Sequence, residues 1–293
     1  MEIVEDRQTS LGASKRAVQH HYDLGTEFYA VWLDKTRTYS CGLWDGAHTL
    51  QEAQERKLDY HIERANAAGT QRVLDIGCGW GSLLNRLVDK AGVRQAVGLT
   101  LSDGQAQWIS ARADPRISVL VESWEDHLPQ TKYDAIISIG AFEHFARPDL
   151  ESAEVVGAYR KFFLKCHEWL APGAWLSLQT IAYGTARRKD LNRFIVEHIF
   201  PESDLPTLSE IALASDRVFE ITFLRNDRLD YETTLKHWYF NLRANKAGAI
   251  ELVGEEAVAN YEKYLSLFMV GFHTGAMNLL RIAFRRIDAL RER

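Results

Sequence analysis

The chain has 293 residues, of which 46% are hydrophobic and 26% charged, as in soluble globular proteins. Its net charge of −5 gives no reason to expect a nucleic-acid partner. No apolar run approaches the roughly 20 residues of a membrane span, and the acidic N-terminus lacks the pattern of a signal peptide. The three cysteines show no metal-ligand spacing, so we expect no metal site and a reducing, cytoplasmic environment.

The expected elements divide the chain into a helical beginning and an alternating α/β part. In residues 1–70 the sequence predicts only helices, one stretch at 14–33 that is broken near 23–25 and another at 49–68. We expect this part of the chain to form a lid. Strands are then expected at 72–76, 96–101, 117–121, 133–139, 174–181 and 218–224, and helices at 82–91, 103–112, 150–170, 231–246 and 255–290. This alternation predicts a parallel, doubly wound sheet in a single domain. Its core is 71–183 with 217–293, and 184–216 is expected to be a cap insertion over the ligand crevice.

The stretch VLDIGCGWG (73–81) joins a short apolar strand to a glycine-rich turn, and a helix begins at Ser82. Glycine permits positive φ and close approach of a ligand, while the first N–H groups of a helix are free to face it. The spacing Gly77-x-Gly79-x-Gly81 is one residue tighter than the GxGxxG fingerprint of nicotinamide dinucleotide sites. With Asp75 two residues ahead, it resembles the first motif of S-adenosylmethionine (SAM) methyltransferases.

Polar and aromatic residues follow the next two strands. In open α/β sheets the ligand lies beyond the carboxyl ends of the strands. Thr100 and Gln105 can bond a ribose diol there as neutral groups. Trp124 and Glu125 are placed to hold an adenine, and a purely structural role for Trp124 in the core is the alternative.

The fourth strand ends in Gly140-Ala141-Phe142-Glu143-His144-Phe145. A carboxylate beside an imidazole, among aromatic residues at the end of a strand, is an unusual place for surface charge. If Glu143 is buried, it needs a partner and its pKa can be tuned by its surroundings. A structural pair between Glu143 and His144 is the alternative.

Motifs along most of the chain resemble the cyclopropane fatty acid synthases, most closely the short mycolic acid cyclopropane synthase type. They are His21-Tyr22-Asp23-Leu24, Tyr39-Ser40-Cys41, 73–81, Gly98-Leu99-Thr100-Leu101-Ser102, 140–145, Ile199-Phe200-Pro201 and Tyr231-Glu232-Thr233-Thr234-Leu235-x-x-Trp238. The resemblance implies a class I SAM-methyltransferase fold, Rossmann-like, and methylation of an alkene in a lipid chain through a carbocation. Loss of a proton then closes a cyclopropane, or the cation takes another fate, such as a methyl branch.

This chemistry needs a dry, shaped pocket, because an alkene is a weak nucleophile and water would trap the cation. Aromatic residues can stabilise the cation by cation–π attraction. A group must also accept the proton, and members of the family use a bound bicarbonate. By resemblance, Glu143, Tyr231 and the main chain at Cys41 and Ile181 hold this anion. For the cofactor the resemblance implies Tyr22, Tyr39, Ser40, Asp75, Gly77, Gly79, Thr100, Leu101, Gln105, Trp124, Glu125, Ile139 and His144.

One residue departs from the family pattern, in which the fifth strand carries His-Thr-Ile. This chain has Gln179-Thr180-Ile181, and glutamine can donate a hydrogen bond to an anion but cannot carry a charge or relay a proton. Either bicarbonate binds more weakly here or the reaction ends differently. An N- or C-methyltransferase of a small natural product, and a SAM-binding homologue without catalysis, are therefore the alternatives.

The expected substrate is an unsaturated acyl or polyketide-like chain. The chain lacks the extra N-terminal domain of the longer, phospholipid-acting members, which favours a carrier-bound or soluble substrate. Peripheral contact with a membrane and the oligomeric state stay open.

Overall fold

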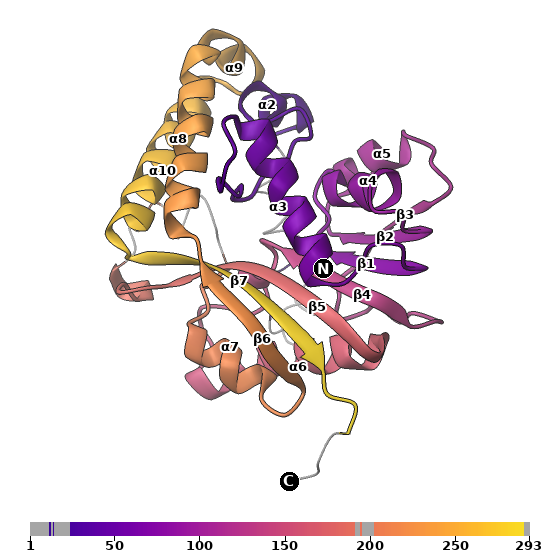
Figure 1. The fold of residues 1–293 in the computed structure, drawn as a ribbon. Coiled ribbons are helices and arrows are strands. Elements are labelled where there is room, and N and C mark those ends of the chain that lie inside the picture. The colour runs from indigo at the N-terminus through magenta and orange to yellow at the C-terminus, as the bar shows by residue number, and fades with distance from the viewer. Residues whose placement is uncertain (1–11, 13, 15–23, 191–193, 195–201, 290–293) are drawn as a thin grey trace, which may run out of the picture.

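The structure is a computed structural model that describes residues 12, 14, 24–190, 194 and 202–289. In this part of the chain a seven-stranded sheet has the order β3-β2-β1-β4-β5-β7-β6 (Figure 1). Its strands are β1 (Arg72–Ile76), β2 (Gln95–Thr100), β3 (Ile117–Val121), β4 (Tyr133–Ile139), β5 (Leu170–Tyr183), β6 (Phe219–Asn226) and β7 (Met277–Arg286). The pairings among β1 to β5 are all parallel, whereas β7 runs antiparallel to both of its neighbours. The sheet is therefore mixed.

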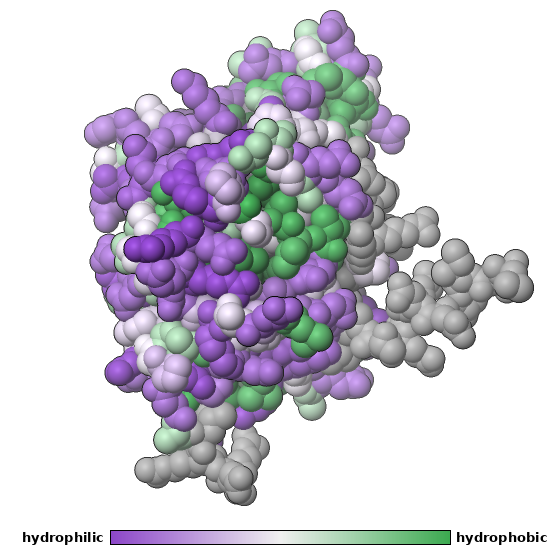
Figure 2. Space-filling view, turned by 90° about the vertical axis from the view of Figure 1, so that its right-hand side faces the viewer, coloured by the Kyte–Doolittle hydropathy of each residue, from purple (hydrophilic) through white to green (hydrophobic). Residues whose placement is uncertain are grey.

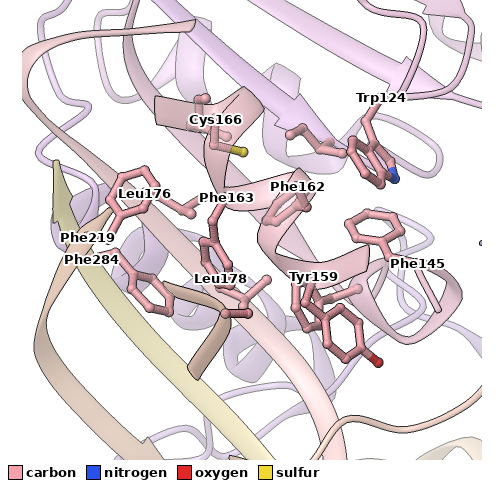
Figure 3. Close-up of a cluster of buried hydrophobic side chains, with 14 of the residues drawn as sticks. Trp124, Phe145, Tyr159, Phe162, Phe163, Cys166, Leu176, Leu178, Phe219 and Phe284 are labelled. Atoms are coloured by element: carbon pink, nitrogen blue, oxygen red, sulfur yellow. The ribbon is translucent and has the colours of Figure 1, made fainter. Parts of the chain in front are cut away.

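Helices cover both faces of the sheet. On one face lie α3 (Leu50–Arg64), α4 (Ser82–Asp89) and α5 (Asp103–Ser110), and on the other α6 (Ser152–Trp169) and α7 (Leu208–Ser215) (Figure 1). Side chains of β1 alternate between these layers: Val73 packs in the α4 cluster and Leu74 in the α6 cluster. Figure 3 shows the α6 cluster, where Phe162 and Phe163 meet side chains of the sheet. The alternating pattern of strands and helices thus produces two buried layers around one sheet.

The remaining helices form a group beyond one end of the sheet. These are α2 (Thr26–Trp32), α8 (Arg228–Ala244), α9 (Lys246–Val253) and α10 (Glu255–Thr274) (Figure 1). Aromatic side chains fill the space between them, and the ring centroids of Trp32 and Trp238 are 5.6 Å apart. These rings and their neighbours, among them Phe28, Tyr231 and Phe268, form a buried group that we call the second aromatic cluster. It lies next to the loop 38–44, which enters the site described below.

The predicted helix over 255–290 is wrong beyond Thr274. Gly275 ends α10 in a left-handed conformation (φ 77°), and Met277–Arg286 forms β7. The apolar run around Leu279 and Phe284 is buried because strands pair with it on both sides. The structure therefore adds an antiparallel strand to the parallel sheet that the sequence predicts.

The fifth strand also differs from the prediction, beginning at Leu170 rather than at residue 174. Its pairing with β4 shifts in register between Tyr133 and Ala135, so residues 171–174 bulge opposite Asp134 and accommodate Pro172 and Gly173. The helix expected within 14–23 falls outside the described residues. Of the segment 184–216, α7 packs against α6, and the role of this segment as a cap stays a prediction, as does the division of the domain.

The side of the molecule that carries α4, α5 and β3 has a hydrophobic area within a hydrophilic surface (Figure 2). Trp108 on α5 is 46% exposed, and the Arg37 guanidinium lies 3.7 Å from its ring centroid. This cation–π contact holds the loop before Tyr39 against α5. Among the described helices, none combines the length and the apolar composition needed to cross a membrane.

Candidate functional site

A cleft opens where the loops after β1, β2 and β4 meet, at the turn 77–81. The N–H groups of Gly77 and Cys78 both donate to the carbonyl of Leu99 on β2, at 3.0 and 2.9 Å. A Cβ on Gly77 (φ 82°) would lie 2.5 Å from Cβ of Ala141, so this position needs glycine. A Cβ on Gly79 (φ 52°) would meet no atom within 4 Å. The turn is therefore packed on one side and open towards the cleft on the other.

The cleft brings together nearly all residues that the sequence predicts for the cofactor. Its lining includes Tyr39, Ser40, Asp75, Gly77, Gly79, Thr100, Leu101, Gln105, Trp124, Glu125, Ile139 and His144. Tyr22 lies outside the described residues. The lining residues come from separate stretches of the chain, which meet only because the strand ends lie at one edge of the sheet.

Thr100 and Gln105 form a buried pair at the end of β2. Thr100 Oγ1 donates to Oε1 of Gln105 (2.7 Å), which orients the amide. The Nε2 group of Gln105 is buried and has no hydrogen-bond partner among the described residues. Because buried donors are nearly always satisfied, this group fits a bound ligand with an acceptor such as a ribose hydroxyl.

The end of the cleft expected to hold an adenine combines packing with polar contacts. Trp124 lines the cleft and also packs in the α6 cluster (Figure 3), and its contact with an adenine stays a prediction. Glu125 Oε1 accepts from Nζ of Lys161 (2.6 Å). Burial lowers the pKa of His144 to about 4, so its imidazole is neutral, and Nδ1 lies 2.6 Å from Oγ of Ser203.

A lysine that sequence reasoning missed lies on the floor of the cleft. Lys57 on α3 donates to Oγ of Ser40 (2.6 Å), and burial lowers its pKa to about 7. Burial raises the pKa of neighbouring Asp75 to about 7 as well, although the Lys57 charge opposes this shift. The signal for Lys57 was present in the sequence, because it follows Ala53 and Gln54 at helical spacing on the buried face of α3.

Glu143 lies in a short helical turn just after β4 and is buried (7% exposed). Its Oε1 accepts a hydrogen bond from the N–H of Ile181 (2.6 Å). Its Oε2 is buried without a hydrogen-bond partner among the described residues. Burial raises the pKa of Glu143 to about 7, against the effect of the Ile181 bond. The expected alternative, a Glu143–His144 pair, is not what the contacts show, since the carboxylate bonds to Ile181.

Cys41, Ile181 and Tyr231 share the second aromatic cluster. The Tyr231 ring lies 4.5 Å from that of Phe272, centroid to centroid. Burial raises the pKa of the Cys41 thiol to about 12, and Sγ donates to the carbonyl of Gly42 (3.1 Å), so this thiol is not a thiolate. The Cys41 N–H makes no hydrogen bond with any described residue. Cys41, Ile181 and Tyr231 thus belong to one buried cluster, in which the Cys41 N–H is an available backbone donor.

Gln179 is bonded within a network that the sequence did not reveal. Its Oε1 accepts from Nε of the fully buried Arg281 (2.9 Å) and lies 3.3 Å from Nε2 of His61. Arg281 also pairs with Asp227. The sequence signal for this network is an arginine inside the apolar run of β7, a region for which the sequence predicts a helix.

The fold and these contacts can be compared with known proteins. A model of the mycolic acid cyclopropane synthetase family matches residues 9–282. The chain belongs to this family. It is 35% identical over 290 residues to cyclopropane mycolic acid synthase 3 of Mycobacterium tuberculosis, covering 92% of this chain and 94% of that protein. It is also 34% identical over 267 residues to hydroxymycolate synthase MmaA4 of Mycobacterium tuberculosis, covering 85% of each.

Among solved structures, mycolic acid cyclopropane synthase CmaA1 complexed with SAH and CTAB matches with a TM-score of 0.84. The two chains are 32% identical, and the match covers 94% of this chain and 99% of that one. The class I Rossmann-like fold is thereby confirmed, and this family member is a SAM-dependent, cyclopropane synthase-like methyltransferase. The roles of individual residues stay predictions.

Proposed function

We propose that this enzyme transfers the SAM methyl group to an alkene carbon of an unsaturated acyl chain, forming a cyclopropane or a methyl branch through a carbocation. The unpartnered oxygen of Glu143, buried beside Ile181, is the observation that carries this proposal. A reaction that removes a proton from a carbon-bound methyl group needs a positioned proton acceptor, and a buried carboxyl group that ionises near neutral pH can take part in such a transfer.

The aromatic cluster supports a cationic intermediate. Tyr39 lines the cofactor cleft and its ring lies 5.2 Å from that of Trp238, which in turn lies 6.0 Å from Tyr231. The rings thus form a continuous series from the cleft to Tyr231 within a buried cluster. Faces of such rings attract a cation, and each contact contributes about 0.5–2 kcal/mol.

The residues fit a small bound anion such as bicarbonate. The Cys41 N–H and the carboxyl oxygen of Glu143 lack partners among the described residues, and a hydrogen-carbonate ion offers both an acceptor and a donor. In this proposal Tyr231 and the main chain at Cys41 and Ile181 orient the ion. The carboxyl group of Glu143 shares a proton with the ion. When bound, the ion supplies the base that accepts the proton from the methylated chain.

The assignment of the cofactor follows from the cleft. We propose that Gly77 and Gly79 lie under the amino-acid end of SAM, with Tyr39 and Ser40 across from them. Thr100 and Gln105 would hold the ribose, which gives the free Gln105 amide a partner. Trp124 and Glu125, with Leu101, Ile139 and His144, would bound the adenine.

Labelled SAM tests the proposal directly. The enzyme is incubated with methyl-labelled SAM and unsaturated acyl lipids, with and without bicarbonate, and label in acyl chains is expected. Glu143→Gln should lower turnover by about 100-fold or more, as for loss of a proton-transfer group. Tyr231→Phe should lower bicarbonate-dependent turnover by roughly 10- to 100-fold, since hydrogen bonds to ions contribute about 1.5–3 kcal/mol.

Controls separate chemistry from folding. Tyr133→Phe removes another buried hydroxyl, at the opposite end of β4, and should leave turnover unchanged. Calorimetry should show SAM affinity within about twofold of the parent in Glu143→Gln. Label transferred only to added amines would favour the small-molecule methyltransferase instead, and no label with any acceptor would favour a non-catalytic SAM-binding protein.

A further inference from the structure

One arginine lies at the centre of the polar network beside the Glu143 region. Arg281 lies on β7 directly opposite Gln179 on β5, and its side chain is fully buried. Burying a guanidinium away from water is costly unless the charge is paired and the donors are bonded. The positions of its partners therefore indicate what this charge does in the fold.

The guanidinium bonds to three segments that are far apart in the sequence. Nε donates to Oε1 of Gln179 (2.9 Å), and Nη1 pairs with Asp227. Nη2 donates to the carbonyl oxygens of Gly42 (2.9 Å) and Cys41 (3.3 Å). A planar fork with fixed donor directions holds such partners in one geometry, which the single ammonium group of lysine does not do.

The first segment contains the free N–H of Cys41. The preceding carbonyl, of Ser40, accepts from Nε2 of Gln54 (2.8 Å), while Arg281 holds the carbonyl of Cys41 itself. The next residue is fixed separately, because the N–H of Gly42 donates to Oγ1 of Thr234 (3.1 Å). Arg281 and Gln54 therefore fix the two sides of Cys41, and with them the direction of its N–H.

The second segment is the side chain of Gln179. Besides Arg281, its Oε1 meets Nε2 of His61, whose pKa is held well below its usual value by burial and by the Arg281 and Lys57 charges. His61 is therefore neutral, so Nε2 donates to Gln179 and Nδ1 accepts from Oγ of Ser177 (2.8 Å). With Oε1 occupied twice, the Gln179 amide group is turned to donate elsewhere, and it makes no bond to a described residue.

The third segment is the start of α8. Asp227 precedes the helix at its N-cap position, and its N–H donates to the carbonyl of Leu279 on β7 (2.8 Å). Tyr231, one turn later, donates its N–H to the Asp227 carbonyl (3.2 Å). The ion pair with Arg281 thus fixes the first turn of α8 against β7, and this turn carries Tyr231.

We propose that Arg281 is a positioning residue for the proton-accepting site. Its buried guanidinium fixes the positions of the Cys41 N–H, the Gln179 amide and Tyr231 at the same time. The inference rests on the proposed function, since these are the groups assigned to the bound anion. It assigns the fork geometry, rather than the positive charge alone, to this role. The charge is already balanced by Asp227 within the pair.

Two variants test this. Arg281→Lys keeps the charge and removes the fork, and should lower bicarbonate-dependent turnover at least 10-fold while SAM affinity stays within twofold, because Arg281 does not line the cofactor cleft. Hydrogen exchange of the peptide covering residues 38–44 should become at least 10-fold faster, with β1 unchanged. Where Arg281→Lys fails to fold, Arg281→Gln with Asp227→Asn removes both charges at once, leaves no unpaired buried ion, and should show the same two changes.

Arg116→Gln, which breaks an exposed ion-pair cluster with Asp114 and Asp89, serves as the matched control and should alter neither readout. Parent-like bicarbonate dependence in the folded variants would overturn the inference. Lost turnover with unchanged exchange would also overturn it, because the effect would then not come from release of the segment 38–44. A parent enzyme that ignores bicarbonate would instead refute the anion-assisted step of the proposed function, and the positioning role with it.

Discussion

The carboxyl group of Glu143 makes the stability of this protein depend on pH in a direction that can be measured. Burial raises its pKa from the usual 4.5 to about 7. Between these values the unfolded chain has released the proton and the folded protein still holds it. Stability from this group is therefore complete below about pH 4.5 and is lost as the pH rises through about 7. Glu143→Gln replaces the carboxyl by a neutral amide that cannot ionise.

The size of the effect follows from the pKa. One pKa unit corresponds to about 1.4 kcal/mol, so the change from 4.5 to about 7 amounts to roughly 3 kcal/mol between acidic and mildly alkaline solution. At about pH 5 the Glu143→Gln variant should exceed the parent by less than about 1 kcal/mol, because the unfolded carboxyl has only begun to lose its proton while the folded one keeps it. At about pH 8 the Glu143→Gln variant should exceed the parent by about 3 kcal/mol, since the parent then buries a carboxylate.

Urea unfolding of both proteins at several pH values between about 5 and 8, without SAM or bicarbonate, measures this difference. Asp75 and Lys57 also have pKa values near 7, but both proteins contain them, so their effects cancel in the comparison. The slopes against urea should be equal in the two proteins. A stability difference that is constant with pH, or that favours the parent as the pH rises, would refute the buried, unpaired state of this carboxyl.

Two further predictions concern the cofactor cleft. Gly79→Val should weaken SAM binding more than tenfold by calorimetry, because the new side chain would point into open space of the cleft; unchanged affinity in a folded protein would contradict the assignment. Lys57→Met should weaken SAM binding several-fold, because Ser40 loses its hydrogen-bond donor and Asp75 loses the cation that lowers its pKa. A variant with parent-like affinity across neutral pH would show that Lys57 is only structural.

The parts of the fold that could be predicted are those where the signal is local. The strand and glycine turn of 73–81 lie in consecutive residues, and their geometry follows from the glycines themselves. The strand β7 was missed because a short apolar run flanked by charges fits a buried helix and a buried strand equally. Only its position between β5 and β6, which depends on the whole sheet, decides between them.

The candidate site divides in the same way. Thr100, Trp124 and Glu143 follow strand ends, and the ends of parallel strands meet at one edge, so their proximity could be predicted. His61 and Arg281 belong to a helix and a strand whose contacts are made only in the folded protein. His61 follows Lys57 at helical spacing, but no spacing in the sequence connects His61 or Arg281 to Gln179.

Gln179 shows why a single departure from a family pattern has to be interpreted with its neighbours. Read alone, it suggests a site weakened by loss of an imidazole. In the structure its Oε1 accepts from Arg281 and faces a neutral His61, so a histidine placed there would sit beside a buried cation. Both burial and that cation lower an imidazole pKa, so such a histidine would stay neutral and could not supply the charge. The glutamine fits this network: it offers two acceptor lone pairs to Arg281 and His61 and still leaves a donor for an anion.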